Sequence, residues 1–275
     1  MLKLSKHEKI IVYALLLIYS VMIIVPFFMM VMNSFKTMRG IFLKPFSMPS
    51  QFVFQNYVDA WNKAQIGTAY MNSALIASTS VIGIIILSSM LAYAISRYQF
   101  PFRRQLFVYT LLGLALPARL AIIPIYIFMR NLNLINTRIG LIIIYVSLGI
   151  PFSMFLLKIF IDAVPIEIEE SARIDGANPW KIFWNIIIPL IKPGIAVVSI
   201  INFVNIWNDF FFPLIFINSK SKATVTLSVM MFQGEYISSW NLLFAGLTLA
   251  MAPMLILFLT FSKQFIGGMT QGAIK

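Results

Sequence analysis

Long apolar runs, separated by short polar segments, dominate the chain. Six runs approach or exceed the length of about 20 residues that a helix needs to cross a bilayer, at residues 10–32, 71–95, 106–129, 139–157, 194–217 and 243–262. The ten-residue alternation typical of a membrane β-barrel does not occur. The pattern therefore predicts an all-α, polytopic membrane protein with six transmembrane helices.

The first run follows Lys3, Lys6 and Lys9 and so resembles the start of a signal peptide. Its apolar stretch is longer than a signal peptide needs, and no small-residue cleavage site follows it. We interpret this run as an uncleaved membrane anchor.

The loop charges predict the orientation of these spans. With the N-terminus in the cytoplasm, the inner segments hold twelve Lys and Arg residues and the outer segments hold eight, and the tight cluster of Arg97, Arg103 and Arg104 lies inside. Positively charged loops stay on the cytoplasmic side. An even number of spans then places both termini in the cytoplasm.

The composition agrees with a lipid environment and excludes several functions. Hydrophobic residues make up 60% and charged residues 11% of the chain, against roughly 45–50% and about 25% in soluble domains. The absence of cysteine excludes disulfides and thiolate metal sites, and one histidine, His7, leaves none for a catalytic triad. We therefore expect no catalytic residue and no metal site. The net charge of +12 suggests membrane lipid headgroups as a partner and not nucleic acid, because the cations lie in loops between apolar runs.

The most polar stretch is the predicted cytoplasmic loop at 158–193. Its local signals predict a helix opened by Pro165, a left-handed turn at Gly176, and a second helix capped by Asn178 and opened by Pro179. The spacing of Trp180, Phe183, Trp184 and Ile187 at intervals of three and four predicts an apolar stripe on the second helix. Two uses remain open from the residues alone: an amphipathic element in the headgroup layer, or a plug that inserts into a groove of a cytoplasmic partner.

This loop resembles the EAA loop of permeases in ATP-binding-cassette (ABC) importers. Glu170-Ser171-Ala172 stands at the Glu-Ala-Ala triplet, Asp175-Gly176-Ala177 follows it, and Pro189 closes the motif. Ser171 replaces the first alanine, which is a change between small residues. The resemblance implies that the loop couples to an ATPase, and the residues that it assigns to this coupling are Glu169, Glu170, Ser171, Ala172, Asp175, Gly176, Ala177 and Pro179.

Four other segments are similar to carbohydrate-uptake permeases of the smaller maltose-transporter type. They are Asn33-Ser34-Phe35-Lys36, Asn56-Tyr57, WNDFFFPL at 207–214 and GGMTQGAIK at 267–275. The resemblance implies a single permease domain over 1–275 with the type I ABC-importer permease fold, in a bacterial plasma (inner) membrane. It also implies three protein partners: a second, homologous permease subunit in a heterodimer, a dimer of ATP-binding subunits, and an extracellular or periplasmic sugar-binding protein. The outer loop at 33–70 either lies at the lipid interface through its aromatic side chains or docks that binding protein.

The chain carries no Gly-x-x-x-x-Gly-Lys-Ser/Thr loop, so we expect no cofactor on it and place ATP and Mg²⁺ in the partner ATPase. Two rival functions remain open. One is a permease of the same architecture for an amino acid, a peptide or an anion. The other is a secondary transporter that works alone, which would favour coupling-ion carboxylates near the midplane.

Two opposite charges lie within predicted spans. Arg119 is about ten residues, or roughly 15 Å, and Asp209 about eight residues, or roughly 12 Å, from the outer ends of their runs. Because charges in lipid need water, a partner or freed backbone, and Pro117, Pro124 and Pro213 free carbonyl groups, we expect both spans to line a polar cavity. Arg119 and Asp209 either pair across it or are satisfied independently.

Amides recur every three residues on the fifth run, at Asn202, Asn205 and Asn208. They either join helices by hydrogen bonds or offer donors and acceptors to sugar hydroxyls, and nearby aromatic rings, including Trp207, either stack on sugar faces or pack. The residues that we expect along a translocation pathway are Arg119, Tyr126, Asn205, Asn208 and Asp209.

Overall fold

The computed structural model describes residues 5–115, 117–233 and 239–271, with backbone only from 261 onward, and every regular element in these ranges is helical. The helices are α1 (Lys6–Ser34), α2 (Met38–Leu43), α3 (Gln55–Lys63), α4 (Ile66–Arg97), α5 (Arg103–Ala115), α6 (Ile122–Asn131), α7 (Arg138–Asp162), α8 (Ile166–Ile174), α9 (Pro179–Ile182), a π-helical turn (Phe183–Ile187), α10 (Ile188–Leu190), α11 (Lys192–Asn208), α12 (Phe211–Phe216), a 3₁₀ turn (Lys220–Lys222), α13 (Val225–Met230) and α14 (Trp240–Gln271). Lys3 and residues 272–275 of the predicted C-terminal motif lie outside the described residues.

The chain divides into two compact units. Unit 1 comprises residues 1–67 and 228–253, and unit 2 comprises residues 68–227 and 254–275. Each is described by itself below.

Four described helices are long and apolar enough to cross a membrane: α1, α4, α7 and α14. A fifth candidate is the segment Pro179–Leu190 joined to Lys192–Asn208 with a bend of 75°. The predicted runs at 10–32, 71–95, 139–157 and 243–262 thus each correspond to one long helix, and α7 passes through Pro151 without a break. The six-span topology and the cytoplasmic termini stay predictions.

The runs at 106–129 and 194–217 are each divided into two helices. The run at 106–129 is split into α5 and α6. The backbone between them turns, with hydrogen bonds from Leu120 N to Pro117 O (2.8 Å) and from Ala121 N to Ala118 O (3.2 Å). Proline lacks the N–H that would continue the helix. The second run is split at Asp209, whose backbone is extended, before α12 begins.

Unit 1 is organised around the buried amide of Asn56 on α3. Its Nδ2 donates to the carbonyls of Ser34 (2.8 Å) and Lys36 (2.9 Å), and its Oδ1 accepts a hydrogen bond from Asn241 of α14 (2.8 Å). Ser34 also bonds the Tyr57 hydroxyl at 2.6 Å. The two segments Asn33-Ser34-Phe35-Lys36 and Asn56-Tyr57, which both carry the family resemblance, are therefore in contact, and Asn56 fixes the backbone that follows α1.

Lys36 is buried in the same unit. Its Nζ donates to the carbonyl oxygens of Lys44 (2.9 Å) and Pro45 (3.2 Å). Burial lowers the pKa of this ammonium group, and the two carbonyls stabilise its charged form. The lysine thereby closes the loop that carries α2.

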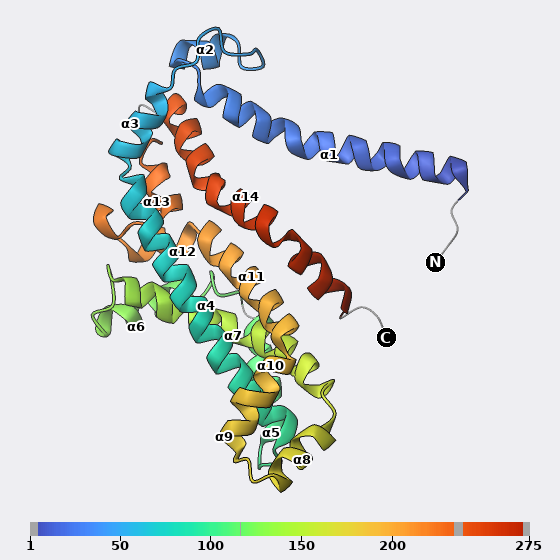
Figure 1. Ribbon diagram of the computed structural model, residues 1–275. Helices are drawn as coiled ribbons and strands as arrows, with labels where there is room; N and C mark the ends of the chain where they lie inside the picture. The colour runs from blue at the N-terminus through green and yellow to red at the C-terminus, as the bar shows by residue number, and fades with distance from the viewer. Residues whose placement is uncertain (1–4, 116, 234–238, 272–275) are drawn as a thin grey trace. The chain divides into compact units, whose positions relative to one another are not determined.

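In unit 2, α7 packs against α5 and α11, and α4 runs beside them (Figure 1). Asn202 of α11 donates to Ser153 Oγ of α7 at 3.0 Å, which confirms an interhelical role for this amide. The contact is close because Gly149 has no side chain: a Cβ there would lie 2.4 Å from Ile84 Cδ1 and 2.9 Å from Asn202 Oδ1.

Two asparagines hold the loop after α12 against the helices of unit 2. Asn72 donates to the carbonyls of Ser221 (3.0 Å) and Ala223 (2.9 Å), and its Oδ1 accepts a hydrogen bond from Arg138 (2.8 Å). Asn136, in the left-handed region at φ 57°, accepts bonds at Oδ1 from the backbone N–H and the hydroxyl of Ser219. These side chains replace the regular helical bonds that the loop lacks.

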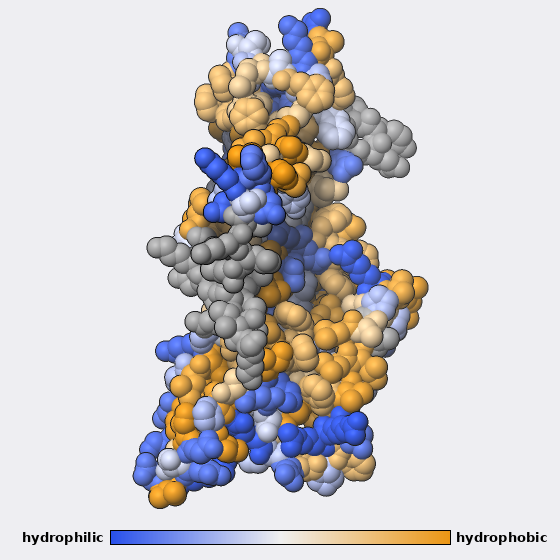
Figure 2. Space-filling model, turned by 90° about the vertical axis from the view of Figure 1, so that its right-hand side faces the viewer, coloured by the Kyte–Doolittle hydropathy of each residue, from blue (hydrophilic) through white to orange (hydrophobic). Residues whose placement is uncertain are grey.

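Large apolar side chains remain on the outside of the long helices. Those of α1 are exposed from Ile10 to Phe28, and Figure 2 shows many hydrophobic residues on the visible face beside groups of hydrophilic ones. Such apolar surface is typical of a protein surrounded by lipid.

The Gly149 contact yields a packing prediction. Gly149→Ala places a methyl group in occupied space and should destabilise the protein by about 1–3 kcal/mol. The measurement is the apparent unfolding temperature of detergent-purified protein, followed by tryptophan fluorescence. The control is Ser147→Ala on an exposed position of α7, which should change stability by less than about 0.5 kcal/mol; equal unfolding temperatures for the two variants would contradict the packing.

Candidate functional site: the cytoplasmic loop and the polar recess

The predicted helix–turn–helix of the loop is present. α8 follows Pro165, and it ends in a turn at Gly176, whose φ is +82°. The N–H of Ala177 donates to the carbonyl of Ala172 (2.9 Å) and the N–H of Gly176 to that of Arg173 (3.0 Å). This pair of bonds is the Schellman motif, in which glycine takes the left-handed position without steric cost.

The second helix begins as expected, and its apolar stripe contains both buried and exposed side chains. Asn178 Oδ1 accepts a hydrogen bond from Lys181 N at 2.8 Å, with Pro179 at the first helical position. Of the four apolar residues, Trp180 and Trp184 are exposed, whereas Phe183 and Ile187 are buried. The helix continues through a π-helical turn at Phe183–Ile187, whose hydrogen bonds join residues i and i+5.

Glu169 lies at the centre of a buried ion pair. Its carboxylate is fully buried, Oε1 lies 2.5 Å from Arg97 Nε, and Oε2 accepts a hydrogen bond from the Tyr93 hydroxyl at 2.9 Å. Arg173 lies 3.8 Å away on the exposed side of α8. Arg97 and Tyr93 both belong to the last turns of α4, so this cluster fastens the loop to that helix.

Arg97 also binds the end of a third helix. Its Nη2 donates to the carbonyls of Ile161 (2.9 Å) and Val164 (2.6 Å), at the C-terminus of α7. Carbonyls there have no helical partner and carry partial negative charge. One guanidinium group therefore joins α4, α7 and α8, a role that the sequence did not indicate for Arg97.

The other predicted coupling residues form the surface of the loop. Glu170, Ser171, Asp175, Gly176 and Pro179 are exposed, and Ala172 and Ala177 are half-buried. A Cβ added at Gly176 would meet no atom within 4 Å. The loop thus divides into an internal anchor at Glu169 and an exposed surface that carries the acids Glu170 and Asp175.

Arg119 and Asp209 line the same recess of about 660 Å³ in unit 2. Within the described residues no ion pair joins them. Asp209 accepts hydrogen bonds from the Tyr145 hydroxyl (2.8 Å) and from the N–H groups of Phe211 (3.3 Å) and Phe212 (3.1 Å), while the Arg119 guanidinium lies 5.4 Å from the centre of the Phe211 ring. The Asp209 carboxylate is therefore satisfied by Tyr145 and by the freed backbone at the start of α12, while the exposed Arg119 contacts the Phe211 ring.

The amides of α11 separate by role. Asn205 and Asn208 are exposed and line the recess, whereas Asn202 is bonded to α7. Tyr126 is not among the lining residues and packs on Phe216, with ring centres 5.9 Å apart. Trp207 is buried and stacks on Tyr70 and Phe203, so it does not present a face to the recess.

The buried pair predicts a contrast between neighbouring glutamates. Glu169→Gln leaves the Arg97 charge buried without its counter-ion and should cost about 3–5 kcal/mol, whereas Glu170→Gln on the surface should cost less than about 0.5 kcal/mol. Apparent unfolding temperatures of the purified variants measure the difference.

A double-mutant cycle tests whether the two charges act as one unit. Arg97→Leu/Glu169→Leu should be less destabilised than the sum of its single variants, since it leaves no lone buried charge. Additive losses would show that the two side chains stabilise the fold independently.

Comparison with known proteins agrees with this geometry. Residues 84–270 match the family described as the binding-protein-dependent transport system inner membrane component. The diacetylchitobiose uptake system permease protein NgcG of Streptomyces coelicolor is 36% identical over 265 residues, which cover 96% of this chain and 88% of that protein. The melibiose/raffinose/stachyose import permease protein MelC of Bacillus subtilis is 32% identical over 252 residues, or 91% of each chain.

A solved structure shares the fold. It is a chain in the crystal structure of a bacterial ABC transporter involved in the import of the acidic polysaccharide alginate, with a TM-score of 0.84 at 22% identity, covering 96% of this chain and 100% of that one. The all-helical architecture is thus that of an ABC-importer permease. The chain belongs to the binding-protein-dependent transport system inner membrane component family, as a non-catalytic permease subunit of an ABC transporter.

Proposed function

We propose that this chain is a permease subunit of an ABC importer for a sugar or oligosaccharide that an external solute-binding protein delivers. The observation that carries the proposal is the similarity, over nearly the whole chain, to permeases named for diacetylchitobiose and for melibiose, raffinose and stachyose. The family description itself names dependence on a binding protein.

The proposed topology has six spans with both termini in the cytoplasm. It counts the broken pairs α5–α6 and α11–α12 as one span each. Broken helices are tolerated at membrane depth where they line a cavity, and both breaks border the recess that holds Arg119 and Asp209. The positive cluster after α4 supports a cytoplasmic position for the loop at 158–193.

In this proposal the exposed acidic surface of α8 and the turn at Gly176 insert into a groove of the ATP-binding subunit. That subunit, in a dimer, supplies ATP and Mg²⁺. The alternative, a loop that only lies in the headgroup layer, has less support, because Glu170 and Asp175 project as exposed acids. A second, homologous permease subunit completes the pathway.

The recess is the proposed place where this chain meets the solute. Asn205 and Asn208 offer amide donors and acceptors, and the ring of Phe211 lies among them. Alternation of access would expose the recess first to the external binding protein and then to the cytoplasm.

The turn at Gly176 tests the coupling. Gly176→Val disfavours the left-handed backbone, whereas Gly176→Asn tolerates it but adds a side chain on the surface. If the loop inserts into the ATPase, both variants and Glu170→Ala should reduce co-purification of the ATPase at unchanged membrane levels, by roughly tenfold for the loss of one charge-assisted contact. If the Gly176→Asn and Glu170→Ala variants co-purify with as much ATPase as the wild type does, the loop has only a structural role.

The solute is tested by uptake of labelled oligosaccharides with the full transporter. Asn205→Ala/Asn208→Ala should raise the KM for sugar about tenfold, because two hydrogen bonds are lost, while Ser147→Ala should not change it. Uptake should stop when the ATPase is deleted. Sugar uptake without any ATPase would identify a stand-alone secondary transporter, and selective uptake of an amino acid, a peptide or an anion would contradict the sugar assignment.

A further inference from the structure

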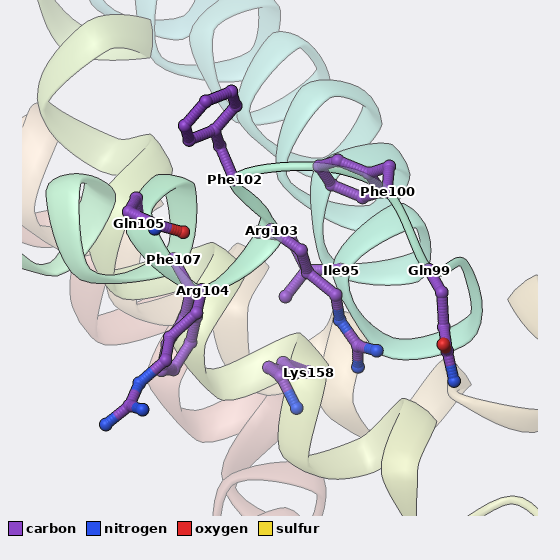
Figure 3. A pocket seen from close by; sticks show the side chains of 9 residues that line it. All are labelled: Ile95, Gln99, Phe100, Phe102, Arg103, Arg104, Gln105, Phe107 and Lys158. Atoms are coloured by element: carbon purple, nitrogen blue, oxygen red, sulfur yellow. The ribbon is translucent and has the colours of Figure 1, made fainter.

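A second recess, of about 580 Å³, lies where α4 ends and α5 begins. Figure 3 shows the charged ends of Arg103 and Lys158 below the α4–α5 turn, with Arg104 extended on the other side of Lys158, by Phe107. The residues that line it are Ile95, Gln99, Phe100, Phe102, Arg103, Arg104, Gln105, Phe107 and Lys158.

The lining carries three positive charges and no acidic residue. Lys158 has one carboxylate neighbour, Asp162 on the next turn of α7 at 2.5 Å, and lies 5.6 Å from the centre of the Phe107 ring. Arg103 donates to the Ser96 carbonyl at 3.3 Å, and no ion-pair partner of Arg104 occurs among the described residues. Within the described residues only Lys158 of the three cations has a carboxylate partner, so the recess carries an excess of positive charge.

Aromatic side chains border the same recess. Phe102 is 74% exposed although its φ is +64°, a left-handed conformation that a bulky residue rarely adopts. Phe100 beside it is exposed as well. Such a conformation persists where the surroundings stabilise it and marks a candidate functional position, and exposed aromatic rings beside cations are typical of the membrane–water interface.

We propose that this recess binds the phosphodiester headgroup of an anionic phospholipid. The cations neutralise the phosphate, Gln99 and Gln105 supply amide groups toward the headgroup, and Phe100 and Phe102 contact the upper part of the acyl chains. A lipid fits better than a free phosphate ion, because the cations stand at the end of the long apolar helices α4 and α7 and share the recess with apolar rings. The proposal rests on the topology given above, which places this recess at the cytoplasmic leaflet.

The bound lipid would act beside the coupling loop. Lys158 lies on the last turns of α7, which end at Asp162 and lead into α8, and Arg103 follows Arg97 by six residues. A phosphate in the recess therefore offsets the repulsion among cations close to the buried Arg97–Glu169 pair.

The test compares lipids retained by the full transporter after extraction into nanodiscs that contain equal amounts of phosphatidylglycerol and phosphatidylcholine. Native mass spectrometry counts the retained lipids, so the result does not depend on transport or on the identity of the solute. Arg103→Gln/Arg104→Gln should lower the retention of phosphatidylglycerol roughly thirtyfold, at about fivefold per charge. Arg103→Lys/Arg104→Lys should keep it, and Lys181→Gln/Lys192→Gln is the control that removes the same charge outside the recess.

Equal retention of phosphatidylglycerol in the glutamine variant and the control would overturn the proposal. Equal retention of the two lipids by the wild type would overturn it as well. Inorganic phosphate or glycerol phosphate that displaces phosphatidylglycerol at micromolar concentration would reassign the recess to a soluble anion. Failure of sugar uptake alone would leave the lipid result standing.

Discussion

The arrangement of α4, α7 and α8 depends on one interaction, the buried ion pair of Arg97 and Glu169. Both side chains are almost fully removed from water, at 8% and 0% exposure, and such desolvation is costly unless every polar atom finds a partner. Here the Tyr93 hydroxyl and two carbonyls at the end of α7 complete the set. The pair therefore makes one connected body of three helix ends that are far apart in the sequence.

This ion pair determines how firmly the loop at 158–193 is held against the helices. α8 contains nine residues, which is too short for a helix to be stable alone in water. Its Schellman turn shapes its end, but the bond from Glu169 to α4 determines where it stands. In the proposed function, a movement of the exposed acids of the loop would therefore be passed on to α4 and α7 through this ion pair. The end of the same loop, Pro179–Leu190, joins α11 at a bend of 75°, and α11 lines the recess that holds Asp209.

Much of this arrangement could be predicted from the sequence where local rules act. Gly176, Asn178 and Pro179 determine the turn through backbone freedom, capping and a missing N–H, and the structure confirms all three. The breaks in the third and fifth runs depend on what the freed backbone can bind, and the Asp209 contacts to α12 are not visible in a hydropathy pattern. The π-helical turn at Phe183–Ile187 is not indicated by the ordinary helical spacing of the apolar residues there. The partnership of Glu169 with Arg97 spans 72 residues, and no periodicity indicates it; each charge alone resembles a surface residue.

The rigidity of this connection can be measured directly, since the chain has no cysteine to interfere with labels. Spin labels at Ile174→Cys on α8 and Gln99→Cys after α4, in the assembled transporter, report the distance between the loop and the helix in nucleotide-free and ATP-bound states. A rigid connection predicts one narrow distance distribution between the two labels that is the same in both states. The distribution should become broad once Glu169→Gln is added. A distance that changes by several ångströms on ATP binding, with Glu169 intact, would contradict it.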